Sequence, residues 1–129
     1  LALAEADAGA DVIFAAAGGS GLGVFNAAQQ GTFKAIGADV NQCLIDPDHI
    51  MLSAIRKIDV VIKDGIKSAI DGTLEGGTMV PGLKEDALGI TNEGSKVEIE
   101  PASLDAAQTA KDKIISGEIT VPSTIDEVK

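Results

Sequence analysis

The sequence predicts an α/β domain in which a parallel sheet is flanked by helices. Segments with helical spacing alternate with short apolar runs, and such alternation is typical of parallel strands joined by right-handed crossovers. The first apolar run has no polar and apolar alternation, as expected of a strand that is buried on both faces. The chain has 129 residues, of which 45% are hydrophobic. That length suits one domain, and that hydrophobic content excludes a disordered protein.

The first part of the chain predicts a helix, a strand and a second helix. Leu1 to Gly9 is rich in Ala and Leu and ends at a glycine that can stop a helix. Asp11 to Ala17 is an apolar run with β-branched residues, and the glycine turn GGSGLG follows it at Gly18 to Gly23. Val24 to Ala35 then has helical spacing, and Gly31 either ends that helix or weakens it.

Two more strands and an amphipathic helix come next. Ala35 to Ala38 predicts a strand that ends at Asp39, and Ile50 to Ile55 predicts a third strand after a loop that contains Pro47. The following segment predicts a helix that Gly72 ends. This helix spans Ile58 to Asp71, with Ile58, Val61 or Ile62, Ile66 and Ile70 on one apolar face.

The character of the chain changes at Gly76, and we divide the domain there into residues 1–75 and 76–129. The second region opens with three short strand-like pieces, TMVPGL, DALGI and KVEIE. Pro101 then leads into an amphipathic helix from Ala102 to Ser116. We expect the tail GEITVPSTIDEVK to be a final docked strand or an extended segment.

Composition excludes several classes of function. The formal net charge is −10 and the chain has no Trp or Tyr, so neither phosphate neutralisation nor base stacking supports a nucleic-acid partner. Cys43 is the single cysteine and cannot form an internal disulfide. Because the chain starts with Leu1 rather than Met, we expect it to be a piece of a longer protein.

The glycine turn is the first candidate site. Gly18 and Gly19 follow a strand and precede a helix, where a ligand can approach the backbone closely. A dinucleotide fingerprint reads G-x-G-x-x-G; Gly19 and Gly21 match it, but Val24 stands at its third glycine. Three interpretations stay open here: a tight structural turn, contact with some ligand, or dinucleotide binding.

Three charged residues follow the second and third strands. Asp39 comes directly after the second strand, where its carboxylate could accept two hydrogen bonds from a sugar diol. Arg56 and Lys57 follow the third strand, and we expect at least one of them to face the same crevice. The alternatives are a capping or solvent-facing role for Asp39 and ordinary surface ion pairs for the two cations.

No group of residues predicts catalysis. His49 is the only histidine and has no metal ligand at the usual spacing, so we expect no metal site. Ser20 does not stand in a nucleophile elbow, and Cys43 has no evident base. The residues therefore indicate a binding module that is not an enzyme and needs no cofactor.

Four segments in succession give the chain a family resemblance. They are ADVIFAAAGGSGLGVFNAAQQ, AIGADVNQ, MLSAIRKIDVVIKDGIKSAIDG and GLKEDALGI, and the ending IISGEITVPST continues the match. In order and spacing they resemble the C-terminal part of the basic membrane protein family, the purine-nucleoside-type substrate-binding lipoproteins of ABC transporters.

The resemblance implies a type I periplasmic-binding-protein fold, in which two lobes close on a ligand. This chain would supply the C-terminal lobe, with its core in 1–75 and hinge-crossing strands and the last helix in 76–129. Gly18 or Gly19, Asp39 and Arg56 would contact the nucleoside, with Asp39 on the ribose. The family usually has a second acid where Asn41 stands and Lys where Arg56 stands.

The resemblance also implies partners and a location. A small-molecule ligand, most simply a purine nucleoside, and an ABC permease are the expected partners of the full-length protein. That protein is expected to be lipid-anchored on the extracytoplasmic face of the membrane, and the isolated lobe to self-associate. The alternatives are a fragment of a dinucleotide-binding enzyme and a ligand-sensing regulatory domain of the same fold.

Overall fold

The computed structural model describes residues 1–128 and contains one four-stranded sheet in the order β1-β2-β3-β4. Its strands are β1 (Val12–Phe14), β2 (Lys34–Asp39), β3 (Ile50–Arg56) and β4 (Leu88–Thr91). The first three strands are parallel, and β4 pairs antiparallel to β3 at the edge. The predicted α/β class with a largely parallel sheet is therefore confirmed.

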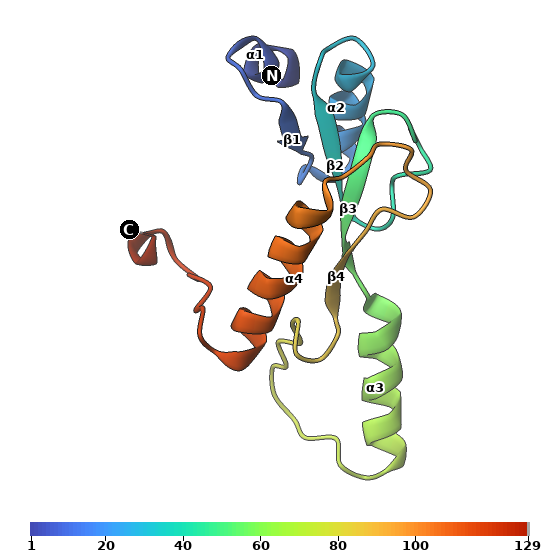
Figure 1. Ribbon diagram of the computed structural model, residues 1–129. Helices are drawn as coiled ribbons and strands as arrows, with labels where there is room; N and C mark the ends of the chain where they lie inside the picture. The colour runs from blue at the N-terminus through green and yellow to red at the C-terminus, as the bar shows by residue number, and fades with distance from the viewer. Residues whose placement is uncertain (129) are drawn as a thin grey trace.

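The described part of the chain also contains four α-helices (Figure 1). They are α1 (Ala2–Asp7), α2 (Gly21–Ala28), α3 (Ile58–Ile70) and α4 (Pro101–Ser116). Helices α1 and α2 lie beside the first strands, whereas α3 extends from the far end of β3, away from them (Figure 1). In the part of the chain that the structure describes, no helix is both long enough and apolar enough to cross a bilayer.

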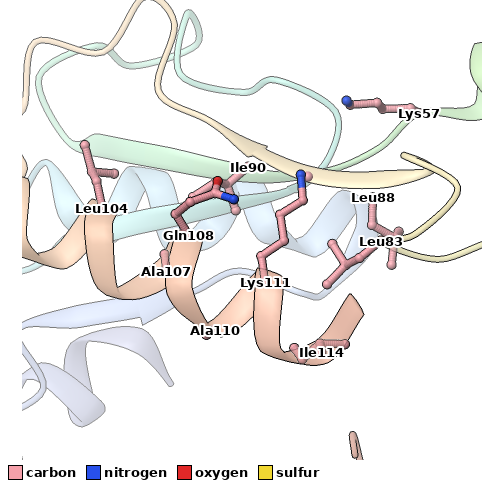
Figure 2. A pocket seen from close by; sticks show the side chains of 11 residues that line it. Lys57, Leu83, Leu88, Ile90, Leu104, Ala107, Gln108, Ala110, Lys111 and Ile114 are labelled. Atoms are coloured by element: carbon pink, nitrogen blue, oxygen red, sulfur yellow. The ribbon is translucent and has the colours of Figure 1, made fainter. Parts of the chain in front are cut away.

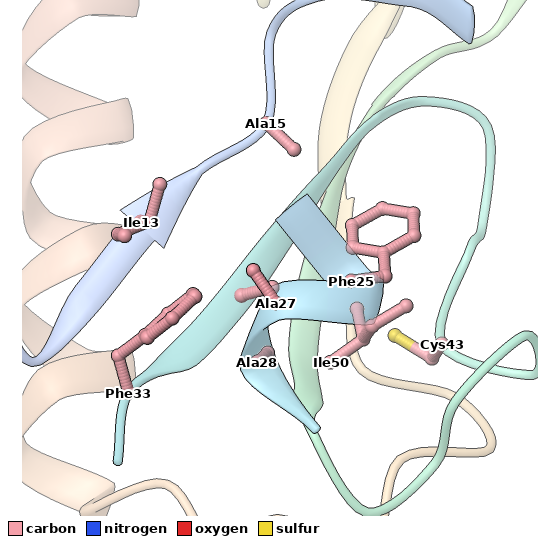
Figure 3. Packing of buried hydrophobic residues seen from close by; sticks show 9 residues of the cluster. Ile13, Ala15, Phe25, Ala27, Ala28, Phe33, Cys43 and Ile50 are labelled. Carbon is pink, nitrogen blue, oxygen red and sulfur yellow. The ribbon is translucent and has the colours of Figure 1, made fainter. Parts of the chain in front are cut away.

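The hydrophobic core lies between α2 and the first three strands (Figure 3). Phe25 on α2 and Phe33 just before β2 are its largest members, and both are almost fully buried. The other members of the core cluster are Ile13, Ala15, Ala27, Ala28, Ala35, Cys43 and Ile50. Small alanines let α2 approach the sheet closely, which fixes the position of the glycine turn at its start.

The second helix begins earlier and ends earlier than the predicted Val24 to Ala35. It starts at Gly21, inside the glycine turn, and stops at Ala28, so Gly31 lies beyond it. Phe33 and Ala35 explain the early end, because both side chains are buried in the core and the chain must leave the helix to place them there. The apolar residues that predicted one long helix therefore belong partly to α2 and partly to the segment that leads into β2.

The first strand is shorter than the predicted Asp11 to Ala17 and is not buried on both faces. It spans only Val12–Phe14, and only its central residue, Ile13, is buried. Val12 and Phe14 are 40% and 54% exposed. Among residues 1–128, β1 is an edge strand of the sheet. The face that carries Val12 and Phe14 is not covered by another layer, which explains their exposure.

Only one of the three strand-like pieces after Gly76 forms a strand. The DALGI piece contributes to β4, whereas TMVPGL and KVEIE form irregular segments. The tail is extended and exposed up to a short 3-10 turn, η2 (Ile125–Glu127), so of the two predicted alternatives the described part, 117–128, forms the extended segment and not a docked strand. Lys129, the last residue of the predicted second region, lies outside the described residues.

Helix α3 has the predicted length but an open apolar face. Its bounds, Ile58–Ile70, agree with the pattern, yet none of its residues is buried. Four isoleucines, Ile58, Ile62, Ile66 and Ile70, are 54–80% exposed. An apolar stripe of this kind normally faces a core, whereas on α3 it is open in the described residues.

Candidate ligand-binding site

The carboxyl ends of β1, β2 and β3 meet at one edge of the sheet, because these strands are parallel. Gly18 and Gly19 follow β1 in a 3-10 turn, η1 (Gly18–Ser20). Asp39 is the last residue of β2, and Arg56 is the last residue of β3. The sheet topology thus brings these four predicted site residues to a single edge, where ligands bind in open α/β sheets.

The glycine turn leaves open space above the backbone. Gly18 has φ +53°, a left-handed conformation that residues with a side chain rarely adopt. A Cβ atom added to Gly18 or Gly19 would meet nothing within 4 Å. Internal packing therefore requires neither glycine. What distinguishes them locally is the left-handed backbone of Gly18 and the open space beside both residues.

Helix α2 starts directly at this turn without a side-chain cap. Ser20 occupies the N-cap position, but its hydroxyl makes no capping hydrogen bond. Gly21 has a different role from its neighbours, since a Cβ there would lie 3.2 Å from the backbone oxygen of Ala15. It lets α2 begin against the end of β1, which is a packing function.

Asp39 and Arg56 form an ion pair at the ends of their strands. The Asp39 Oδ1 atom lies 2.7 Å from Arg56 Nη2. The two side chains are 50% and 60% exposed, so the pair is open to solvent and to a ligand. Asp39 has φ +72°, one of two positive values among the non-glycine residues described, and such outliers cluster at functional sites.

Lys57 does not join Asp39 but turns to the β4 side. Its Nζ atom donates a hydrogen bond to Asp86 Oδ1 at 2.7 Å. That hydrogen bond, together with the lysine charge, lowers the pKa of the exposed Asp86 carboxyl below its usual value. Of the two predicted cations, only Arg56 therefore pairs with Asp39 in the described structure.

Lys57 instead borders an apolar groove of about 590 Å³ between β4 and α4 (Figure 2). Leu88 and Ile90 line it from β4, and Leu104 and Ile114 line it from α4. Gly18, Asp39 and Arg56 are not among the residues that line this groove.

Three residues near the Asp39 turn form a connected group that no sequence motif indicated. Gln42 accepts a hydrogen bond from the Ala38 N–H, and Ser53 accepts one from the Gln42 N–H. Gly37 lies beneath both side chains, and a Cβ there would be 2.7 Å from Ser53 Oγ. A glycine inside a strand is the one signal that could have indicated this close approach.

The remaining polar candidates lie elsewhere. His49 Nδ1 pairs with Asp46 Oδ1 at 2.9 Å near the amino ends of the strands, opposite the site edge. Cys43 is fully buried beside Ser53. Among residues 1–128 no three His, Cys, Asp or Glu side chains are grouped so as to hold a metal ion.

Residues 1–124 match the model of a protein family described as Bmp, ABC transporter substrate-binding protein PnrA-like. Basic membrane protein D of Borreliella burgdorferi is 41% identical over 122 residues, covering 88% of this chain. The ABC transporter nucleoside-binding protein BmpA of Lactococcus lactis is 33% identical over 143 residues, covering 95% of this chain. An uncharacterized lipoprotein of Pyrococcus abyssi is 38% identical over 87 residues, or 63% of this chain and 22% of the relative.

Solved structures share the fold. A solute-binding protein of an ABC transporter system from Aeropyrum pernix superposes with a TM-score of 0.73 at 26% identity, covering 97% of this chain and 44% of that one. A transcriptional activator of the comK gene from Bacillus halodurans gives a TM-score of 0.79 at 19% identity, covering 93% and 42%. At that identity the second likeness shows the fold alone.

The chain spans 35% of the length of the Borreliella relative and 39% of that of the Lactococcus relative. The family match nevertheless runs through all of α1 to α4 and ends in the tail. This chain therefore belongs to the family of PnrA-like ABC transporter substrate-binding proteins, the basic membrane protein family whose resemblance its sequence carries.

Proposed function

We propose that this chain forms one lobe of the substrate-binding protein of an ABC importer and that it binds a nucleoside-like ligand at the site edge. The ligand would be captured between this lobe and a second one, without covalent chemistry. Family membership supports the transport role. The name of the Lactococcus relative, a nucleoside-binding protein, supports the ligand class.

The observation that carries the proposal is the Asp39 carboxylate at the end of β2. It is half exposed, and its Oδ1 atom is paired with Arg56. A carboxylate has about four lone-pair positions, so an oxygen paired with a guanidinium can still accept a hydrogen bond from a hydroxyl. Two vicinal hydroxyls of a ribose match two carboxylate oxygens, and Gly18 and Gly19 leave room for the ligand beside them.

The exposed faces of α3 and α4 support a second lobe. The isoleucine stripe on α3 is open, and Leu104 on α4 is 37% exposed. Burying such side chains contributes about 1.5–3 kcal/mol each, so a sequence that keeps them indicates a covering layer. A permease partner and a lipid anchor on the extracytoplasmic face complete the proposal for the full-length protein.

Calorimetry of the full-length protein with purine and pyrimidine nucleosides tests the ligand class. Inosine, adenosine and guanosine are expected to bind, and their 2′,3′-dideoxy analogues to bind at least about 100-fold more weakly, because two hydrogen bonds to a charged group are lost. Absence of heat with every ribonucleoside would overturn the ligand class while leaving the family assignment intact.

Asp39→Ala tests whether the Asp39 carboxylate binds the ribose hydroxyls. It should weaken ribonucleoside binding by about 100-fold or more and leave the dideoxy analogues nearly unaffected. Asp48→Ala is the matched control, since Asp48 is also an exposed, ion-paired acid, at 3.3 Å from Lys96, but lies before β3 rather than after β2. Equal losses in both variants would contradict a specific role for Asp39.

A further inference from the structure

The backbone at Asp39 makes an unusually tight turn. The Val40 N–H donates to the Ala38 carbonyl oxygen at 2.9 Å, which closes a three-residue turn around Asp39. With φ +72° at its centre, this turn has the hand of the strained γ-turn rather than the common inverse form. A residue with a Cβ stays in such a conformation only when its surroundings hold it there.

The Gln42 side chain contacts this turn on the side of β2 that β1 leaves unpaired. The Ala15 N–H donates to Ile36 O at 2.8 Å, so the backbone groups of Ile36, and of Ala38 two residues later, face β1. The paired register ends at Phe14 and Ile36. The Ala38 N–H therefore has no strand to bind, and Gln42 Oε1 accepts it at 2.8 Å.

Gln42 is itself anchored to the next strand. Its own N–H donates to Ser53 Oγ at 3.0 Å, and Ser53 is fully buried on β3. The side chain then passes over Gly37, where an added Cβ would lie 2.9 Å from Gln42 Oε1. Backbone and side chain of Gln42 are thus both tied, one to β3 and one to β2.

We propose that Gln42 is a positioning residue for the ligand: its side-chain carbonyl, anchored through Ser53, locks the strained turn that aims the Asp39 carboxylate. The proposal rests on the proposed function in one respect, namely that the Asp39 carboxylate accepts hydrogen bonds from the sugar hydroxyls. Without the Gln42 acceptor, the turn relaxes to a negative φ and the carboxylate leaves its place beside Arg56.

Gln42→Met tests the lock, because methionine keeps the length of the side chain and removes the acceptor. In the full-length protein, the one-bond Cα–Hα coupling of Asp39 distinguishes positive from negative φ without any ligand. The wild type should show the positive value and the variant a shift to the negative one. Gln42→Glu keeps the acceptor and should restore the positive value.

Binding gives the second measurement. Gln42→Met should weaken inosine binding by about 10-fold and leave 2′,3′-dideoxyinosine unchanged, so that the ratio of the two affinities falls. A merely structural role would lower both affinities together. Gln29→Met is the matched control, because Gln29 donates its side-chain hydrogen bond to Asp46, in the loop before β3, and its loss should leave the ratio unchanged.

The outcomes separate the two proposals. If the wild type binds no nucleoside, the proposed function fails, and the coupling measurement still decides whether Gln42 holds the turn. If Gln42→Met keeps both the positive φ and the affinity ratio, the positioning role is overturned. Should Gln42→Met not fold, Gln42→Asn repeats the test, because it preserves the backbone bond to Ser53 and shortens the reach to Ala38.

Discussion

Asp39 combines a position set by topology with a conformation set by its neighbours. Its place after β2 was predictable, because the apolar run before it ends there and parallel strands share one carboxyl edge. Its pairing with Arg56 was one of the alternatives that the sequence left open. The positive φ and the contact from Gln42 to Ala38 were not predictable, since they depend on β1 stopping short of Ala38.

Asp46 provides a prediction about pH at the scale of one residue. Burial acts to raise the pKa of this carboxyl, but hydrogen bonds from His49 and Gln29 and the charge of His49 outweigh it, and the pKa falls below its usual 3.8. The folded-state pKa is then lower than the unfolded one. Asp46 therefore stabilises the fold above about pH 3.8, and this stabilisation is lost as the pH falls through the folded-state pKa.

Urea unfolding between about pH 2 and about pH 6 measures this effect. The wild-type free energy of unfolding should decline on the acid side of this range, and Asp46→Asn should show a shallower decline from a lower starting value. Asp48→Asn is the control, because Asp48 is exposed and forms only a surface ion pair. An identical acid slope in wild type and Asp46→Asn would contradict the assignment.

At the scale of elements, the sequence predicted which segments form helices and strands better than it predicted what they contact. The pattern for α3 identified its length and its apolar face correctly, and β2 and β3 were predicted to within about two residues. Periodicity reports which side of a helix is apolar, but not which surface covers it. The open face of α3 and the exposed face of β1 therefore came only from the structure.

The packing of α2 on the sheet gives a prediction with a built-in control. Phe25 is 2% exposed, whereas Phe14 is 54% exposed. Phe25→Ala should lower the free energy of unfolding by about 3–5 kcal/mol, because the lost transfer energy and the new cavity add together. Phe14→Ala should cost less than about 1 kcal/mol. Similar costs for both, measured by urea unfolding, would contradict the position of the core.

The α3 stripe gives a prediction about association. Ile62 and Ile66 are each 57% exposed in residues 1–128, and a contiguous apolar stripe favours contact with another surface. Sedimentation of the 129-residue chain should show association that increases with protein concentration and is weakened by Ile62→Lys plus Ile66→Lys. The control is Lys63→Ala plus Lys67→Ala on the same helix. Association that ignores the isoleucine changes would exclude α3 as the contact.

For the whole molecule, stability is distributed unevenly along the chain. All but one of the buried residues described lie between Ile13 and Ser53, and Ala87 is the exception. Helices α3 and α4 have no buried residue. A region with few buried apolar contacts unfolds locally at a low free-energy cost. The second half of the chain should therefore unfold locally more often than the first half.

Hydrogen exchange of the 129-residue chain measures that difference. Amides of α2, β2 and β3 should exchange on the order of 100-fold more slowly than amides of α3 and α4. If the proposed second lobe covers the α3 stripe, the difference in exchange rate should be smaller in the full-length protein. Uniform protection in the isolated chain would contradict the uneven core.

The left-handed turn at Asp39 has a consequence for evolution. Gly and Asn adopt a positive φ more readily than Asp does, so Asp39→Gly and Asp39→Asn should raise cellular abundance and remove the ionised carboxylate. Selection for expression alone would then drive position 39 towards these residues, and under the proposed function only selection for growth on a transported nucleoside would retain the acid. A library of all residues at position 39, screened once for abundance and once for growth on the nucleoside, should therefore select different amino acids in the two screens.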